Sequence, residues 1–181
     1  MRVISGEYRS RRLLTLPGEK TRPTLDRVKE AVFSHLGTME NRCFLDLFCG
    51  SGAIGIEALS RGAKLVIFND WDTEAIATTK KNLDNLKIAP AKYQIRQLDF
   101  RQLLKTIAMQ FDFIYIDPPY DSGLFQEVLA QITQYRVLKP QGEIIVESEK
   151  NEELNDDELE ITKTVKYGRV KINYLKNKKT I

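Results

Sequence analysis

The chain has 181 residues, the length of a single domain that can bury a hydrophobic core, with little left for a second domain. With 42% hydrophobic and 29% charged residues, the composition is that of an ordinary globular protein and excludes the disordered and fibrous classes. No apolar run approaches the roughly 18 residues that a membrane span needs, and the N-terminus lacks the apolar segment of a signal peptide, so the sequence predicts a cytoplasmic protein with no membrane partner.

The net charge is only +3, but the charged residues are unevenly distributed along the chain. The N-terminal segment is rich in arginine, residues 147–160 are acidic, and the chain is basic again from Lys163 onward. Such basic segments on a nearly neutral protein indicate a surface patch for an anionic partner, although charge runs also serve simply to solvate a face. His35 is the only histidine, and Cys43 and Cys49 lack the spacing of metal ligands, so we expect reduced thiols and no metal site.

The first predicted elements are a basic hairpin over residues 3–16, with Gly6 near its turn, and an extended loop leading to Pro23. Thr24 is predicted to cap a helix over residues 25–36, where apolar residues recur at helical spacing. Strands and helices then alternate: strands over 44–48, 65–69, 93–98, 111–116 and 143–147, and helices over 53–61, 73–86, 101–109 and 124–135.

This alternation predicts an α/β fold with a doubly wound, mostly parallel sheet and helices on both faces. Two final strands, over 158–167 and 169–176, flank Gly168 with no helix between them, so we expect a terminal antiparallel hairpin that completes a seven-stranded sheet. We divide the chain into an N-terminal basic arm, residues 1–24, and a main domain, residues 25–181.

The first motif with chemical content is DLFCGSGAIG, Asp46 to Gly55, at the junction of the first strand and its helix. Gly50 and Gly52 permit a tight turn and a close approach of the backbone to a ligand. With Gly55 they also satisfy G-x-G-x-x-G, the fingerprint of dinucleotide-binding folds, so an NAD site is a serious alternative. A flexible turn without a ligand is the other alternative.

Acidic residues end the next two strands. Asp70 lies about 20 residues beyond the glycines, where a carboxylate accepts hydrogen bonds from the ribose hydroxyls of an adenosine. Asp72 is better explained as a helix cap. Asp99 follows the third strand and either accepts from an adenine amino group or caps the helix that begins at Arg101.

The decisive motif is Asp117-Pro118-Pro119-Tyr120, at the carboxyl end of the fourth strand, where ligands bind in such sheets. The prolines supply no N–H groups, so the stretch presents acceptors, namely the Asp117 carboxylate and the Pro118 carbonyl. Two acceptors that bind the hydrogens of an exocyclic amino group favour a tetrahedral nitrogen with a free lone pair. Tyr120 offers a ring on which an unstacked base can lie. An ordinary turn is the alternative.

Together, DLFCGSGAIG and DPPY resemble the amino-methyltransferases that depend on S-adenosylmethionine (SAM), whose fold has a Rossmann-like sheet with a terminal antiparallel strand. RVISGEYRSRRL, TRPTLDRVKEAVFSHL, DLFCGSGAIGIEALSRGA, DPPY and the late VES span nearly the whole chain. This combination is similar to the bacterial 16S rRNA guanine-N(2) methyltransferases of the RsmD family. One departure is Asp70, which stands where relatives often have glutamate.

The resemblance implies SAM as cofactor, no metal, and 16S rRNA of the small ribosomal subunit as partner. It implies catalytic roles for Asp117, Pro118, Pro119 and Tyr120. The residues expected to contact the cofactor are Asp46, Phe48, Gly50, Ser51, Gly52, Asp70 and Asp99, with Arg22 and Thr24 at its methionine end or on the RNA. Arginine pairs with phosphates and stacks on bases, so Arg9, Arg11 and Arg12 of the arm are candidate RNA contacts.

Four other functions stay open on the sequence. A DNA amino-methyltransferase would use the same acceptor motif, but usually carries a target-recognition region for which this chain has no room. The protein glutamine methyltransferases resemble this chain with asparagine at position 117. An NAD-dependent oxidoreductase has no use for DPPY, and a non-catalytic RNA-binding module has no use for the acceptors in it.

Overall fold

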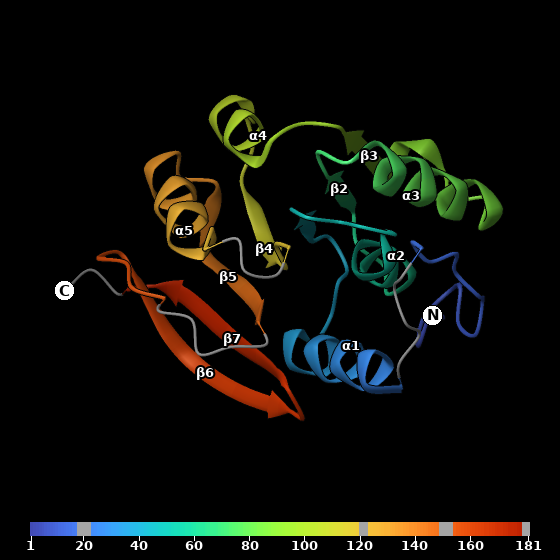
Figure 1. Cartoon of the computed structure of the whole chain (residues 1–181), viewed down its shortest axis with the longest axis horizontal. Coiled ribbons are helices and arrows are strands. Elements are labelled where there is room, and N and C mark those ends of the chain that lie inside the picture. The colour runs from blue at the N-terminus through green and yellow to red at the C-terminus, as the bar shows by residue number, and fades with distance from the viewer. Residues whose placement is uncertain (18–22, 120–122, 149–153, 179–181) are drawn as a thin grey trace.

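The computed structural model describes residues 1–17, 23–119, 123–148 and 154–178, with only the backbone for residues 23–25. One seven-stranded sheet has the order β3-β2-β1-β4-β5-β7-β6 (Figure 1). Its strands are β1 (Cys43–Asp46), β2 (Leu65–Asn69), β3 (Tyr93–Arg96), β4 (Phe111–Ile116), β5 (Leu138–Ser148), β6 (Leu159–Tyr167) and β7 (Val170–Asn177). The helices are α1 (Pro23–Leu36), α2 (Ala53–Ser60), α3 (Thr73–Asn85), α4 (Phe100–Thr106) and α5 (Phe125–Gln134), with a 3₁₀ turn over Pro90–Lys92.

The doubly wound parallel sheet predicted from the alternation of elements is confirmed. Strands β1 to β5 pair in parallel, whereas β7 pairs antiparallel with both β5 and β6. Every residue of β4 is buried, as expected for a central parallel strand that is covered on both faces. The terminal hairpin is therefore also confirmed, and it forms the edge of the sheet.

Two hydrophobic clusters lie on the two faces of the sheet. Helices α1, α2 and α3 cover one face, with Phe33 of α1 stacked 6.0 Å from Phe44 of β1. Helices α4 and α5 cover the other face through residues such as Leu104 and Val128. The three layers leave the carboxyl ends of the parallel strands at one edge of the sheet, where loops rather than helices follow β1, β2 and β4 (Figure 1).

Several boundaries differ from those predicted. Residues 1–17 of the N-terminal hairpin contain one isolated antiparallel bridge, Arg2 to Arg12, and a few backbone hydrogen bonds such as that of the Val3 amide to the Arg11 carbonyl, but no regular strand. Helix α1 begins at Pro23, so Thr24 lies in its first turn rather than before it as a cap, which suits the fixed φ of proline at a helix start. Strand β5 begins at Leu138 and not at residue 143, because residues 139–142 are accommodated as an irregularity in its pairing with β4.

The first 17 residues of the N-terminal arm pack on α2 and α3. Glu57 of α2 is fully buried and accepts hydrogen bonds from the backbone N–H groups of Ile4 and Ser5 at 2.8 and 3.0 Å. Lys29 of α1 lies 3.4 Å from the Glu57 carboxylate and Arg61 lies 2.8 Å from it, so the buried charge is paired. Burial lowers the pKa of Lys29, and the charge of Glu57 opposes that shift.

Gly6 sits where the arm touches α2. Its φ is +86°, and a Cβ there would lie 1.8 Å from the carbonyl oxygen of Ser60. Only glycine fits this approach without moving the arm. The arm is thus fixed by backbone contacts, while its arginine side chains stay on the surface.

Candidate active site

The carboxyl edge of the sheet gathers four acidic residues from four neighbouring strands. Asp46 ends β1, Asp70 follows β2, Asp117 follows β4, and Glu147 lies near the end of β5. Asp46, Asp70 and Glu147 are buried, whereas Asp117 is exposed. The expectation that the glycine loop and the Asp117 loop lie at one edge is therefore confirmed.

The glycine loop between β1 and α2 is held in a defined shape. Gly50 and Gly52 have φ values of +52° and +79°, and a Cβ on Gly52 would lie 2.8 Å from the Thr79 hydroxyl. Thr79 of α3 donates to the Gly50 carbonyl at 2.9 Å, and Asn82 donates to the Ser51 carbonyl at 2.9 Å. The loop backbone is thus set before any ligand arrives, as a ligand-binding turn requires.

Asp70 ties the end of β2 to that loop. Its Oδ2 accepts from the Gly50 amide at 2.9 Å and its Oδ1 accepts from the Asp72 amide at 3.0 Å. Each carboxylate oxygen has two lone pairs, so both can accept a further hydrogen bond. Asp72 caps α3 by accepting from the Ala75 amide at 2.8 Å, which confirms its predicted role.

Asp46 is a structural acid beneath the loop. Its Oδ2 accepts from the Gly55 amide at 2.9 Å, and the carboxyl group is fully buried. Burial, reinforced by the charge of Asp70, raises the pKa of Asp46 to about 7, and the Gly55 hydrogen bond opposes this rise. Gly55 is itself a packing residue, because a Cβ there would lie 2.3 Å from the Phe68 ring.

Asp99 caps α4, which was one of its two predicted roles. It accepts from the Arg101 amide at 2.8 Å and forms an ion pair with the Arg101 guanidinium at 3.2 Å. Arg101 in turn binds Glu127 of α5 through two contacts of 2.5 and 2.6 Å. The side chain of Asp99 is 46% exposed, so the cap leaves one flank of the carboxylate open to a ligand.

Phe48 packs against Phe100 at a ring distance of 5.7 Å, which directs it toward α4. In the acceptor motif, Pro118 is buried, whereas Asp117 and Pro119 are exposed. Tyr120 and Arg22 lie outside the described residues, as does the side chain of Thr24.

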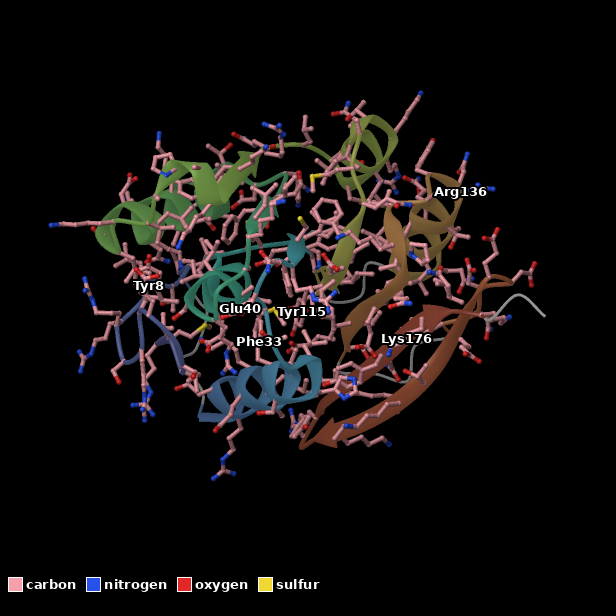
Figure 2. All side chains as sticks on the ribbon, turned by 180° about the vertical axis from the view of Figure 1, so that it is seen from behind. Tyr8, Phe33, Glu40, Tyr115, Arg136 and Lys176 are labelled. Carbon is pink, nitrogen blue, oxygen red and sulfur yellow. The ribbon has the colours of Figure 1, made fainter. Side chains whose placement is uncertain are left out.

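Sequence reasoning missed a buried pair behind the acceptor motif. The Tyr115 hydroxyl of β4 donates a hydrogen bond to the Glu147 carboxylate of β5. Burial, then the charges of Glu147 and Asp117, raise the pKa of Tyr115 well above its ordinary value. Figure 2 shows Tyr115 inside the molecule, and Tyr115 belongs to the same hydrophobic cluster as Phe33. Two features of the sequence could have indicated this pair. Tyr115 lies in an apolar strand two residues before Asp117, and Glu147 lies in the segment Val146-Glu147-Ser148 at the end of the next strand.

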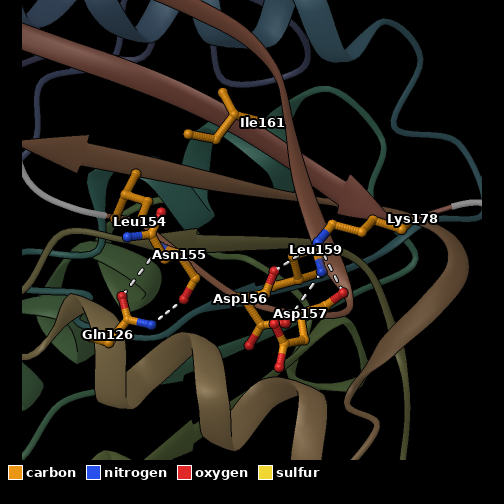
Figure 3. A pocket seen from close by; sticks show the side chains of 8 residues that line it. All are labelled: Gln126, Leu154, Asn155, Asp156, Asp157, Leu159, Ile161 and Lys178. Carbon is orange, nitrogen blue, oxygen red and sulfur yellow. Dashed lines mark hydrogen bonds between the residues drawn. The ribbon is translucent and has the colours of Figure 1, made fainter.

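A pocket of about 710 Å³ lies elsewhere, between α5 and the start of β6 (Figure 3). Two of its polar side chains bind backbone groups of the lining: Gln126 pairs with the Asn155 backbone, and Lys178 donates to the backbone carbonyls of Asp156 and Asp157. None of the four carboxylates lines this pocket, so we do not treat it as the active site. Across the described ranges, no group of three His, Cys, Asp or Glu residues is placed to hold a metal ion, and no helix is long and apolar enough to cross a membrane.

The site therefore combines a glycine turn with positive φ, a carboxylate at the next strand end and an exposed acidic loop one strand away. Residues 1–176 match the family described as Conserved hypothetical protein 95, which is the RsmD family. The chain belongs to this family. A relative in Bacillus subtilis, named putative rRNA methyltransferase YlbH, is 39% identical over 93% of this chain and 94% of its own length.

Another member of the family, the ribosomal RNA small subunit methyltransferase D of Haemophilus influenzae, is 38% identical over 85% of this chain and 81% of its own length. Among solved structures, the putative methyltransferase yhhF of Escherichia coli is similar with a TM-score of 0.87 and 26% identity, covering 98% of this chain and 97% of that one. A putative methylase from Haemophilus influenzae has a TM-score of 0.82 and 32% identity, covering 97% of each chain. The family is thus one of methyltransferases with this α/β fold.

Proposed function

We propose that this protein transfers a methyl group from SAM to the exocyclic N2 amino group of a guanine in 16S rRNA of the small ribosomal subunit. The observation that carries the proposal is the placement of Asp117 and Pro118, directly after β4, at the edge of the sheet that also holds the glycine loop. A loop rich in acceptors beside a nucleoside-binding turn suits methylation of an amino group. The relatives named above as rRNA methyltransferases support RNA as the substrate.

The residues of the loop fit SAM. Gly50 and Gly52 present backbone without side chains, and Asp70 has free lone pairs for the two ribose hydroxyls. The proposed contacts also include Asp46, Phe48, Ser51 and Asp99, with Arg22 and Thr24 at the methionine end. Asp46 acts through Gly55, since it is buried beneath the loop.

SAM, when bound, supplies a methyl group already activated on a sulfonium, so the protein has mainly to position the acceptor. The Asp117 carboxylate and the Pro118 carbonyl accept the two N–H groups of the guanine amine, which keeps its lone pair free and aimed at the methyl carbon. Tyr120 stacks on the base. The methyl group that bound SAM would supply would form the new N–C bond, and the electron pair of the broken S–C bond would remain on the sulfur of the cofactor. The methylated nitrogen is acidic and loses a proton, for which Asp117 is the nearest proposed acceptor.

The arm provides the proposed contact with RNA. Arg9, Arg11 and Arg12 are exposed, and of their side chains only Arg11 has a recorded hydrogen bond within the described part of the chain, at 3.3 Å to the Asn85 carbonyl. Residues 1–24 thus serve the substrate, residues 25–181 form the methyltransferase domain, and a cytoplasmic location follows from a ribosomal substrate.

The deciding experiment is incubation of the protein with labelled SAM and small-subunit particles that lack the modification, followed by nucleoside analysis. We expect the label in N2-methylguanosine. Label in an adenine or cytosine of DNA supplied in parallel would favour the DNA amino-methyltransferase instead. Absence of label from RNA, with a protein that binds SAM, would reject the proposed substrate.

A further inference from the structure

The terminal hairpin is strongly positively charged. From Ile161 to Lys178 the sequence has six lysine and arginine residues and no aspartate or glutamate. The edge strand β6 is exposed at each position from Glu160 to Thr164, so neither face of that stretch is covered. Charge alone makes a solvated face, and the arrangement of these six residues is more informative.

Three of the six have partners, and all three lie away from the turn of the hairpin. Lys163 Nζ is 3.2 Å from His35 Nδ1, Lys176 Nζ is 3.8 Å from the Glu143 carboxylate, and Lys178 donates to backbone carbonyls at 3.1 and 2.9 Å. Figure 3 shows Lys178 turned toward these carbonyls. These lysines hold the hairpin to α1, β5 and the segment before β6.

The other three, Lys166, Arg169 and Lys171, form what we call the tip cluster. None of them has an ion pair or side-chain hydrogen bond within the described residues. Lys166 and Lys171 stand directly opposite each other in the antiparallel pair, and like charges in that position destabilise a sheet. A protein that keeps an unfavourable pair of cations beside an exposed arginine is well suited to bind an anion there.

The tip cluster lies at the same edge of the sheet as the candidate active site. Lys171 pairs with Ser148, the last residue of β5, and β5 is the parallel neighbour of β4. Ile116 of β4 pairs with Val146 of β5. The loop that starts at Asp117 therefore leaves the sheet beside Glu147, one residue before Ser148. With strands about 4.8 Å apart, the backbone of Lys171 lies about 10 Å from that loop.

We propose that the tip cluster binds backbone phosphates of the substrate RNA next to the methylated base. The inference rests on the proposed function. A base held at Asp117 has its own and neighbouring phosphates within the reach of lysine and arginine side chains about 10 Å away. The cluster and the N-terminal arm flank α1, which contacts the arm through Lys29 and the hairpin through His35 (Figure 1). RNA that contacts both the arm and the tip cluster would therefore lie along α1.

The test is a triple variant, Lys166→Gln, Arg169→Gln and Lys171→Gln, in the full chain. The matched control is Lys64→Gln, Lys105→Gln and Arg136→Gln, which also removes two lysines and one arginine. These control residues are exposed and lie at the opposite, amino-terminal edge of the parallel strands; Figure 2 shows Arg136 at the periphery. Binding of unmodified 16S rRNA is measured by filter retention over a series of salt concentrations, alongside thermal unfolding and SAM binding.

We expect the tip variant to bind RNA about tenfold more weakly and to lower the magnitude of its salt slope by about 2 to 3, the value for three lost phosphate contacts. The control should match the wild type. Thermal stability should be unchanged or raised, since the substitutions remove a like-charge pair. Single-turnover methyl transfer at saturating RNA should be retained, because the cluster holds the RNA and not the reacting amine.

An equal loss of RNA affinity in the tip variant and the control variant would show a general effect of charge and overturn the inference. Wild-type RNA affinity and salt slope in the tip variant would also overturn it. Lower thermal stability with unchanged RNA binding would make the cluster structural and would also overturn the inference. Should the triple variant fail to fold, Arg169→Gln alone, in the exposed turn, must lower the slope by about 1. A tip-dependent slope without methyl transfer by the wild type would reject the proposed function, and with it the placement of the tip cluster beside a methylated base; only RNA binding by the cluster would remain.

Discussion

The Asp70 carboxylate accepts a hydrogen bond from the Gly50 amide, with 2.9 Å between Oδ2 and N. The carboxylate expected to bind ribose is therefore also the group that fixes the glycine loop. A residue that shapes a turn and contacts the ligand in it affects ligand binding in two ways. Its removal costs the direct contact and loosens the turn.

We expect Asp70→Ala to weaken SAM binding by about 1.5–3 kcal/mol, the range for hydrogen bonds to a charged group. Titration calorimetry should show that the wild type binds SAM and S-adenosylhomocysteine but not NAD. The control is Asp72→Ala, which removes the cap of α3 and should lower stability by about 1 kcal/mol while leaving SAM affinity unchanged. Wild-type SAM affinity in Asp70→Ala would eliminate this residue as the ribose ligand.

Asp117→Ala is expected to lower the single-turnover rate about a hundredfold or more, the typical cost of losing one preorganised group that contacts the reacting centre. The fold and SAM affinity should be kept, because Asp117 is exposed and no cofactor contact is assigned to it. Rapid-quench measurements with labelled SAM and RNA report the rate. Near wild-type turnover in this variant would refute the acceptor mechanism.

Two comparisons sharpen that test. Asp117→Asn retains one acceptor oxygen and should fall between the wild type and the alanine variant. Tyr120→Ala should impair turnover far more than Tyr120→Phe, because stacking on the base requires the ring and not the hydroxyl. Equal activity of the two Tyr120 variants would mean that the ring does not hold the base.

The buried Asp46 makes stability depend on pH. Its pKa is raised from 3.8 to about 7 in the folded protein, so the folded state binds more protons than the unfolded state between these values. The stability that protonated Asp46 contributes is therefore fully present below about pH 4 and is lost as the pH rises to about 7. We expect Asp46→Asn, which stays neutral and keeps an acceptor for the Gly55 amide, to flatten this dependence. The measurement is the midpoint temperature of thermal unfolding at pH 5.5 and at pH 8. If the difference between these two midpoints is the same in Asp46→Asn as in the wild type, Asp46 is not the source of the pH dependence.

Replacing Arg9, Arg11 and Arg12 with alanine should weaken binding to unmodified 16S rRNA and reduce the magnitude of its salt slope by about 2 to 3. SAM affinity and thermal stability should stay close to wild type, because the arm is held by its backbone on Glu57 and Ser60 rather than by these side chains. Substrate binding with an unaltered slope would show that the arm is only structural.

The sequence by itself determined the order of elements and the family. Periodicity of apolar residues predicts a strand or a helix locally, so the alternation and the final hairpin could be read without the structure. The glycines, Asp70 and the DPPY motif were also visible, because each sits at a strand end and its chemistry depends on residues close in sequence. The same local patterns gave the wrong start for β5, because the irregularity there depends on the pairing with β4. They also predicted Thr24 as a helix cap, whereas the helix begins at Pro23.

Only the tertiary structure decided what joins distant segments. Glu57 contacts Ile4, which is 53 residues away in the sequence, and Tyr115 contacts Glu147, which is 32 residues away. Lys171 lies at the edge of the sheet that holds the candidate site because it pairs with Ser148. The structure also showed Asp99 as a helix cap and Asp70 as a brace for the loop. These relationships depend on strand order and register, which are set by the packing of the whole sheet, and a local pattern of residues carries no record of them.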